Sequence, residues 1–227
     1  MFLTRRMIAP LLFGLIGAAV LVRLGVWQLE RLEWKRGVLA QIDARIGMVP
    51  VALPAVPDPA TDKYLPVTAT GTLTGSEAHV LSSTRDDGPG YRVIAVLVTG
   101  SGRHILVDLG FVAEVELGTP RPTGPLAVVG NIHWPSEVDS FTPPHDPAQD
   151  LWFARDAAAM AKALGAEPFM LIARTVTPAV NSVTPLPVDS SGIANDHLEY
   201  AITWFSLALV WLGMTGLLLW RIRQRAV

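Results

Sequence analysis

Two long apolar stretches lie near the ends of the chain. Residues 201–220 contain no charged side chain, and twenty such residues are about the length of a helix that crosses ~30 Å of hydrocarbon. Residues 8–22 are also apolar, and a helix continued to Leu29 measures about 33 Å. The pattern predicts one membrane-spanning helix near each end. The rival readings are a cleaved signal peptide for the first stretch and a buried core helix for the second. We favour a retained first helix, because the apolar run continues into a helical pattern without a small-residue cleavage site.

The middle of the chain changes from helical spacing to alternation at about residue 67. Helical spacing persists over residues 29–46, and five Pro residues between positions 50 and 66 indicate a linker. One later helix is expected at about residues 155–164, with Asp156 in its first turn and Gly165 at its end. Turn residues are found at 86–90 and 99–102. Alternating segments predict strands at residues 67–73, 79–82, 91–99, 104–112, 126–132 and 169–177.

These elements predict an α+β membrane protein. Two transmembrane helices flank an antiparallel β-rich domain, either a sheet or a barrel, with one packed helix. The expected segments are, in order, an N-terminus at 1–7, a transmembrane helix at 8–29, a helix extending from the membrane at 30–49, a Pro-rich linker at 50–66, the β-rich domain at 67–177, a return linker at 178–199, a transmembrane helix at 200–220 and a C-terminus at 221–227.

Charge adds an orientation to this picture. Arg221, Arg223 and Arg225 follow the second apolar stretch, whereas residues 181–199 before it contain no Lys or Arg. The positive-inside rule then predicts that both termini are cytoplasmic and that the β-rich domain lies on the other side of the membrane. All 20 Asp and Glu residues fall between positions 30 and 199, and this acidic middle argues against nucleic-acid binding. Membrane lipid is the partner that we expect for the two apolar helices.

Candidate chemistry is sparse. The chain has no cysteine, which excludes disulfides, thiolate metal sites and the attachment of c-type haem. His133, Asp139, His145 and Asp146 are close in sequence and could converge, but ordinary loop residues are the more frequent explanation. No nucleophile motif is present, and Gly100-x-Gly102 fits a hairpin turn better than a phosphate loop. We therefore expect no catalytic residues and no enzyme.

His197 is the one candidate ligand, three residues before the second apolar run. A neutral imidazole there could bind haem iron, with Tyr200 and Trp204 at i+3 and i+7 packing on the porphyrin. Arg31 and Lys35 on the first helix are at the level where the porphyrin carboxylates would need cations. The alternative for His197 is a hydrated residue at the membrane surface. A second alternative concerns one face of the first helix, where an aromatic and cationic anchor at the lipid headgroups would be formed by Trp27, Arg31 and Trp34.

Four sequence blocks resemble the surfeit locus protein 1 family, the cytochrome c oxidase assembly factors. They follow the family's order over about residues 24–220. The blocks are Gly25-Val-Trp-Gln-Leu-Glu-Arg-Leu-Glu-Trp-Lys35, then Gly90-Tyr-Arg-Val with Ile105-Leu-Val-Asp-Leu-Gly-Phe-Val112, then Phe141-Thr-Pro-Pro-His-Asp-Pro147 with Trp152 and Asp156, and finally Asn195-Asp-His-Leu-Glu-Tyr-Ala-Ile-Thr-Trp-Phe205.

This chain departs from the family pattern in two of the blocks. The family's central hairpin usually reads Asn-Arg-Gly-Trp where this chain has Asp108-Leu109-Gly110-Phe111, and the family has Asn where this chain has His145. We expect these departures to alter the surface of the domain. They indicate a divergent bacterial member, placed in the inner (plasma) membrane with a periplasmic domain.

The resemblance implies a role in assembly. Such proteins assist the maturation of oxidase subunit I, and the family is thought to receive haem a and hold it for insertion. In the family, the histidine at the start of the second span is the expected haem ligand. The resemblance assigns this role to His197, with Tyr200 and Trp204 packing beside the haem. Subunit I is the implied partner, and haem A synthase is a further candidate. The rival functions are a scaffold for subunit I that never binds haem and a membrane-anchored periplasmic enzyme.

Overall fold

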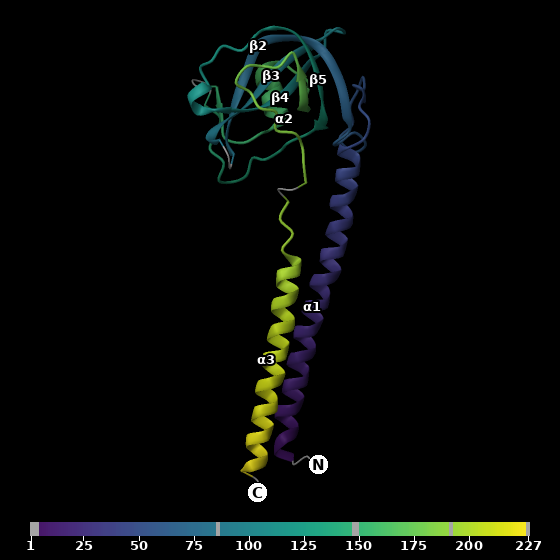
Figure 1. Cartoon of the computed structure of the whole chain (residues 1–227), viewed down its shortest axis with the longest axis vertical. Coiled ribbons are helices and arrows are strands. Elements are labelled where there is room, and N and C mark those ends of the chain that lie inside the picture. Colours follow the sequence, from purple (N-terminus) through teal and green to yellow (C-terminus); the bar gives the residue numbers. More distant parts are fainter. Residues whose placement is uncertain (1–4, 85–86, 147–149, 191–192, 226–227) are drawn as a thin grey trace. The chain divides into compact units, whose positions relative to one another are not determined.

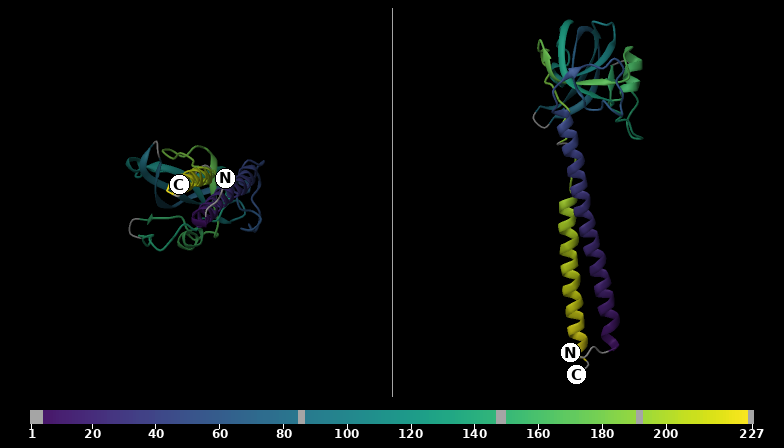
Figure 2. Two further views of the ribbon diagram at one scale, coloured as in Figure 1. Left: turned by 90° about the horizontal axis from the view of Figure 1, so that it is seen from below. Right: turned by 90° about the vertical axis from the view of Figure 1, so that its right-hand side faces the viewer.

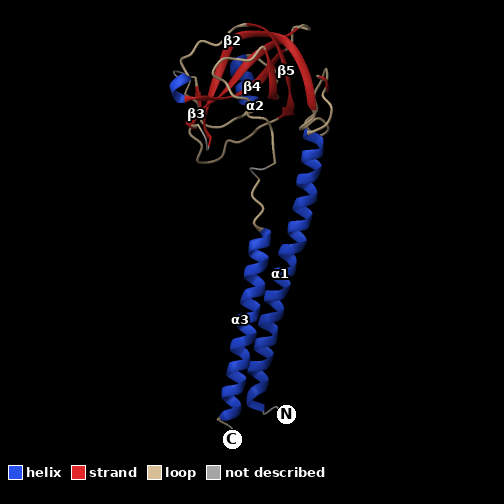
Figure 3. Cartoon of the chain, in the orientation of Figure 1, coloured by secondary structure: helices blue, strands red, loops and turns tan. Residues whose placement is uncertain are grey.

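The computed structural model describes residues 5–84, 87–146, 150–190 and 193–225. The chain forms two compact units. The first combines both ends of the chain, up to residue 41 and from residue 190, and the second comprises residues 42–189. The expected α+β class is confirmed, with long helices in the first unit and a sheet in the second (Figure 3). Asp86 of the expected turn and the outermost residues of both expected cytoplasmic ends, 1–4 and 226–227, lie outside the described residues.

Two antiparallel helices make up the first unit. Helix α1 (Arg5–Ile46) supplies its first 37 described residues to this unit, and α3 (His197–Gln224) lies beside it in both views (Figures 1 and 2). Both helices are long and apolar enough to cross a membrane. Their apolar side chains remain exposed, for example 68% for Phe13 and 72% for Leu209. This exposure argues against a core helix of a soluble protein, in which such side chains are covered.

Small residues let the two helices approach closely. Ala18, Ala201 and Ala208 are buried, and three glycines of α1 face bulky side chains of α3. A Cβ added to Gly25 would stand 2.7 Å from the ring of Phe205, and one on Gly17 would stand 2.5 Å from the ring of Trp211. The buried positions of α1 are three, four or seven residues apart, which is the spacing of a helix–helix seam; they are Met7, Gly14, Ala18, Gly25, Gln28 and Leu32. Glycine at these positions is therefore required by packing.

The ends of both long helices differ from the sequence-based expectation. Helix α3 begins at His197 instead of residue 200, because the backbone N–H of Tyr200 already donates to the carbonyl of Asp196 (3.2 Å). It also continues to Gln224, four residues beyond the expected end of the span. Apolarity marked only the length that fits a membrane, whereas the helical hydrogen bonds continue into the polar flanks. Helix α1 ends at Ile46, where the helical spacing in the sequence ends, although the segment extending from the membrane was expected to run to residue 49.

The second unit is a closed, barrel-like sheet. Its elements are β1 (Val51–Ala52), β2 (Pro66–Thr84), β3 (Gly88–Thr99), β4 (His104–Ala113), a 3-10 helix (Glu114–Glu116), β5 (Gly124–His133), β6 (Leu151–Trp152), α2 (Ala157–Leu164) and β7 (Met170–Thr177). The strand order is β1-β2-β3-β4-β7-β5, and β5 also pairs with β2. This extra pairing closes a ring of five strands, so β1 and β6 are short additions at its margin.

Strand β2 makes closure geometrically feasible. Its first part pairs with both β5 and β3, and its second part continues along β3. The register shifts between Leu73 and Glu77, and Gly75 within that bulge has a positive φ of 85°. A bulge bends a strand and increases its twist, which turns the corner of a barrel. We had expected two strands, at 67–73 and 79–82, because the alternation breaks at this bulge.

Two hydrophobic cores explain the apolar runs of the central strands. One fills the interior of the barrel and includes Val107 and Leu171. The other lies between the outside of the sheet and α2, and includes Leu106 and Met160. Neighbouring residues of β4 therefore point into different cores, and the strand is buried on both faces. Such a strand shows a continuous apolar run instead of clean alternation.

Several expected details of this unit are wrong. The sheet is mixed, because β4 pairs with β7 in parallel, as do β1 and β6 with β2. The chain reaches β7 through the crossover that contains α2, and such a crossover allows parallel entry. Helix α2 begins at Ala157, so Asp156 is its N-cap instead of a first-turn residue, accepting from the N–H groups of Ala158 and Ala159 (3.0 Å each). The segment expected as a linker contains β1, and Pro66 already belongs to β2.

Candidate functional site

His197 is the first residue of α3, and its side chain is half-buried. Its Nδ1 lies 2.8 Å from Oε1 of Gln28 on α1. Gln28 is only 9% exposed and is one of three buried polar or charged residues in the described part of the chain. A carbonyl oxygen accepts only, so Nδ1 carries the proton in this contact, and the neutral tautomer that makes the contact has its lone pair on Nε2. The contact fixes the tautomer and aims the second nitrogen.

The start of α3 is held by a second contact with α1. The ammonium group of Lys35 donates to the carbonyl oxygen of Ala194, in the segment that leads into α3. The expectation that Lys35 offers its charge to a porphyrin carboxylate stays a prediction, because one contact with a backbone carbonyl leaves its other N–H groups available. Both ends of this contact and both residues of the Gln28–His197 pair belong to the helical unit. Two polar contacts thus fix the position of His197 against α1.

The other expected site residues lie along one side of the helix pair. Tyr200 is exposed and Trp204 is half-buried, one and two turns beyond His197. On α1, the guanidinium carbon of Arg31 lies 3.9 Å from the centroid of the Trp34 ring, a cation–π contact. Trp27 and Trp34 are also exposed. The assignment of Arg31, Tyr200 and Trp204 to a haem site stays a prediction.

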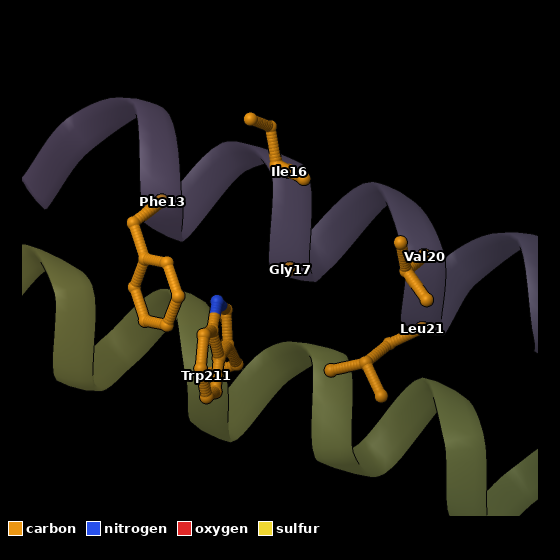
Figure 4. Close-up of a pocket in the computed structure, with 6 residues that line it drawn as sticks. All are labelled: Phe13, Ile16, Gly17, Val20, Leu21 and Trp211. Carbon is orange, nitrogen blue, oxygen red and sulfur yellow. The ribbon is translucent and has the colours of Figure 1, made fainter. Parts of the chain in front are cut away.

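An apolar groove lies farther along the same two helices (Figure 4). It has a volume of about 320 Å³ and is lined by Phe13, Ile16, Gly17, Val20, Leu21 and Trp211. The indole Nε1 of Trp211 donates to the carbonyl oxygen of Gly14 (3.0 Å), and its ring centroid is 5.3 Å from that of Phe13. Sequence reasoning did not single out this groove. The signal was available as glycines on one apolar helix opposite tryptophan on the other.

A network of ion pairs surrounds the buried carboxylate of Asp108 in the β-rich unit. Asp108 is fully buried and accepts from Arg92 (2.8 Å) and Arg155 (3.2 Å). Arg155 also donates to Glu137 (2.5 Å). Burial alone would raise the pKa of Glu137, but the hydrogen bonds and charge of Arg155 lower it. Burial likewise disfavours the charged form of Arg155, and its two carboxylate partners raise its pKa overall. The arrangement joins Arg92 and Asp108, which belong to one family-like block, to Arg155 and Glu137, and it has the features of a structural cluster.

A second charged cluster lies on β2. Glu77 accepts from Arg121 (Nε to Oε2, 2.8 Å) and lies 3.1 Å from a ring nitrogen of His79. Burial would raise the pKa of Glu77, but hydrogen bonds from His79 and Arg121 lower it to about 2. Sequence reasoning missed this cluster because Arg121 lies 44 residues away in an irregular segment. The carboxylate is ionised at neutral pH and has no role that points to catalysis.

Three of the four polar residues that could have converged on a metal, His133, Asp139 and His145, have separate surroundings. His133 ends β5 and packs on Tyr64, with ring centroids 5.1 Å apart. Asp139 accepts from the backbone N–H groups of the turn that follows it. His145 stacks on Trp152 at 3.9 Å. Over the described residues, no group of three or more His, Cys, Asp or Glu side chains is arranged to hold a metal ion.

The departures from the family pattern at Leu109 and Phe111 are not surface changes, contrary to expectation, whereas His145 is only half-buried. Leu109 and Phe111 are 1% and 3% exposed. Leu109 belongs to the core inside the barrel, at the irregularity that Gly110 allows with its positive φ of 123°. Alternation had placed one side of β4 towards solvent, but both sides are covered. The substitutions therefore alter the interior of the domain.

Comparisons with known proteins agree with this architecture of two helices and a small barrel. The SURF1 family matches residues 15–209. Surfeit locus protein 1 of Rattus norvegicus is 30% identical over 210 residues, covering 81% of this chain and 67% of that protein. Surfeit locus protein 1 of Homo sapiens is 28% identical over 215 residues, covering 82% and 69%. A SURF1-like protein of Rickettsia bellii is 29% identical over 224 residues, covering 94% and 90%.

The class defined here is a small barrel-like domain joined to a pair of helices long and apolar enough to cross a membrane. The chain belongs to the SURF1 family, because that family matches most of its length. The expected family membership is confirmed.

Proposed function

We propose that this chain is an assembly factor for a haem–copper cytochrome oxidase and that it holds haem a for delivery to subunit I. Membership of the SURF1 family, known for oxidase assembly, supports the assembly role. Subunit I is the partner that such a role requires, and haem A synthase is the source from which haem a would come. The chain acts as a carrier and not as an enzyme.

The observation that carries the haem proposal is the contact between His197 and Gln28. It leaves Nε2 of a neutral imidazole as the free electron-pair donor, which is the form that ligates haem iron. In the part of the chain that the structure describes, no side chain donates a hydrogen bond to that nitrogen. His197 is also the only histidine in the sequence of residues 1–41 and 190–227. The donor set thus fits one axial ligand, which suits a carrier that must release its cargo.

Membrane insertion is part of the same proposal. Both long helices meet the length and apolarity requirement, and their exposed apolar surfaces need lipid. Arg221 and Arg223 follow the apolar part of α3, and the positive-inside rule then assigns both termini to the cytoplasm. We place the protein in the inner (plasma) membrane of a bacterium, with the β-rich domain in the periplasm. A SURF1-like protein from a bacterium supports this setting.

The test is an absorption spectrum of the protein purified from cells that make haem A. We expect a haem a spectrum in the wild type and its loss in His197→Ala. His104→Ala is a matched control, because His104 is an exposed histidine in the β-rich unit and should keep the spectrum. If neither the wild type nor the control carries haem, the carrier role is refuted. Assembly activity that survives in His197→Ala would then favour a scaffold for subunit I.

A further inference from the structure

The apolar groove lies on the same side of the helix pair as the proposed haem site. Phe13 and Val20 line the groove, and Trp27 and Trp34 follow at further intervals of seven residues along α1. Residues seven apart are almost two full turns apart and therefore share a face of the helix. One face of α1 thus runs from the groove to the aromatic residues beside Arg31.

Helix α3 shows the same interval. His197, Trp204 and Trp211 are separated by seven residues each, and Trp211 forms one wall of the groove. The same side of α3 therefore carries the proposed iron ligand, a tryptophan expected to pack on the porphyrin and the groove wall. The two helices are antiparallel and adjacent (Figure 1), and the groove lies between them (Figure 4). The heptad intervals on both helices therefore make the groove a continuation of the proposed site along the pair.

The groove is held open by specific contacts. Gly17 contributes no side chain to its floor, and a Cβ there would stand 2.5 Å from the Trp211 ring. The hydrogen bond from Trp211 to the carbonyl of Gly14 and the contact with Phe13 fix the indole. The six lining residues offer an apolar surface, with the single polar atom of Trp211 already bonded within the pair. Such a lining selects an apolar chain over a polar group.

We propose that this groove is a subsite for the isoprenoid tail of haem a. The inference rests on the proposed haem site at His197. Gly17 lies eleven residues from Gln28, which is about 16 Å along α1 at 1.5 Å per residue. The hydroxyethylfarnesyl tail has a main chain of thirteen bonds, which extends to about 16 Å at about 1.2 Å per bond, the rise of an extended backbone. The tail of a porphyrin bound at His197 therefore reaches the groove and enters it.

This subsite would give the carrier selectivity among haems. Haem b can use the same axial nitrogen, but it lacks the tail, so it gains nothing from the groove. In a membrane or a micelle, the gain for haem a comes from close packing against Trp211 and Phe13, since lipid is as apolar as the tail. His197 then supplies the axial bond to iron, which haem a and haem b share, and the groove makes the carrier prefer haem a over haem b.

The test compares binding of haem a and haem b by the full chain in detergent, measured by absorption titration. Val20→Trp fills the groove, because Val20 is 54% exposed and borders it. The matched control is Val22→Trp, because Val22 is 41% exposed on the same helix but outside the groove lining. We expect the wild type and the control to prefer haem a, and Val20→Trp to weaken haem a binding about tenfold through lost packing contacts, with haem b binding unchanged.

The outcomes separate the two proposals. Unchanged haem b binding shows that Val20→Trp is folded and that its axial site is intact. If haem b binds but the preference for haem a is absent in the wild type, or survives in Val20→Trp, the groove holds only lipid and the subsite is refuted. If neither haem binds to any of the three proteins, the proposed carrier function itself fails, and the subsite fails with it.

Discussion

The guanidinium Nε of Arg92 lies 2.8 Å from Oδ2 of Asp108, a carboxylate whose side chain has no solvent exposure. Asp108 also accepts from Arg155 and from the backbone N–H of Gly110 (3.1 Å). Burying a charge is costly unless ionic and hydrogen-bonding partners compensate it. The cost of burying the Asp108 carboxylate is therefore offset only while Arg92 and Arg155 are both present. Removal of one charged side chain leaves a buried charge without its partner.

Asp108→Asn is expected to destabilise the β-rich unit by about 3–5 kcal/mol, because it keeps the shape of the side chain but leaves Arg92 and Arg155 short of a counter-charge. Chemical denaturation of the detergent-solubilised chain would measure the loss. Glu116→Gln, an exposed acidic residue of the 3-10 helix, is the matched control and should change the free energy of unfolding little. Equal stability of the two variants would contradict the structural role of the network.

His133 should make the domain less stable as the pH falls from about 6.5 to about 4. Burial lowers the pKa of His133 to about 4, and the charges of Lys63 and Arg155 add to this effect against the opposing charge of Glu137. Between these pH values the unfolded chain binds a proton that the folded chain does not, so stability is lost as pH falls. The loss is on the order of 1–3 kcal/mol, measured by denaturation at several pH values. His133→Gln should remove this pH dependence, whereas His104→Gln should leave it.

Glu77 should make the stability of the β-rich unit depend on pH in a separate and more acidic range. Its pKa is lowered from 4.5 to about 2, so its stabilising contribution is complete above pH 4.5 and is lost as the pH falls towards 2. Arg121→Gln removes one of the groups that lower this pKa. We therefore expect acid unfolding of this variant to begin at a higher pH than in the wild type, as followed by circular dichroism. An unchanged acid transition would show that the contact with Arg121 does not hold the Glu77 pKa down.

Gly17→Ala should loosen the helix pair. Its new Cβ would stand 2.5 Å from the Trp211 ring, so the indole must move and lose its hydrogen bond to Gly14. Hydrogen–deuterium exchange around Trp211 should become about tenfold faster, since local opening costs less. Gly37→Ala on the same helix is the control, because a Cβ there meets nothing within 4 Å. That change should stabilise α1 by about 0.5–1 kcal/mol through helix propensity, and faster exchange there would contradict the packing argument.

Trp27→Ala and Arg31→Ala should each lower oxidase activity in membranes without removing the protein from them. Arg31 is stacked on Trp34, and Trp27 is exposed on the same face, so both are available to a ligand or a partner. Each contact of this kind contributes about 1 kcal/mol, so we expect partial loss of oxidase spectra and activity. Arg36→Ala, an exposed cation of the same helix, serves as the control. Normal oxidase spectra in both variants would exclude a role for this face.

The sequence predicted best where a single physical requirement dominates. Twenty uncharged residues before Arg221 predicted a long apolar helix, and Gly165 marked the end of α2, where its φ is +67°. Those signals are local, because apolar length and a left-handed C-cap depend on a few adjacent residues. The start of α3 was displaced by three residues because backbone hydrogen bonding does not follow apolarity.

Long-range relationships could not be predicted in the same way. Gln28 accepts from His197 across 169 residues of sequence, and neither residue carries a signal that names the other. The Arg92–Asp108 pair, the ring closure of β2 on β5 and the groove at Trp211 depend on the same kind of pairing. Sequence reasoning did select His197, from its place beside an apolar run. The contact of His197 with Gln28 could be identified only from the structure, in which the two ends of the chain lie together.

The separation of Gln28 and His197 has a consequence for biosynthesis. Gln28 leaves the ribosome early and His197 very late, with the entire barrel-like unit translated in between. A nascent chain can therefore fold its β-rich unit before the imidazole exists, and it can acquire the oriented ligand only when translation is almost finished. A message cut short after codon 190 would yield the barrel-like unit with α1 alone, without α3 and without the proposed ligand His197. Under the proposed function, a chain would therefore become able to bind haem only once its synthesis is almost complete, after the β-rich unit has been made.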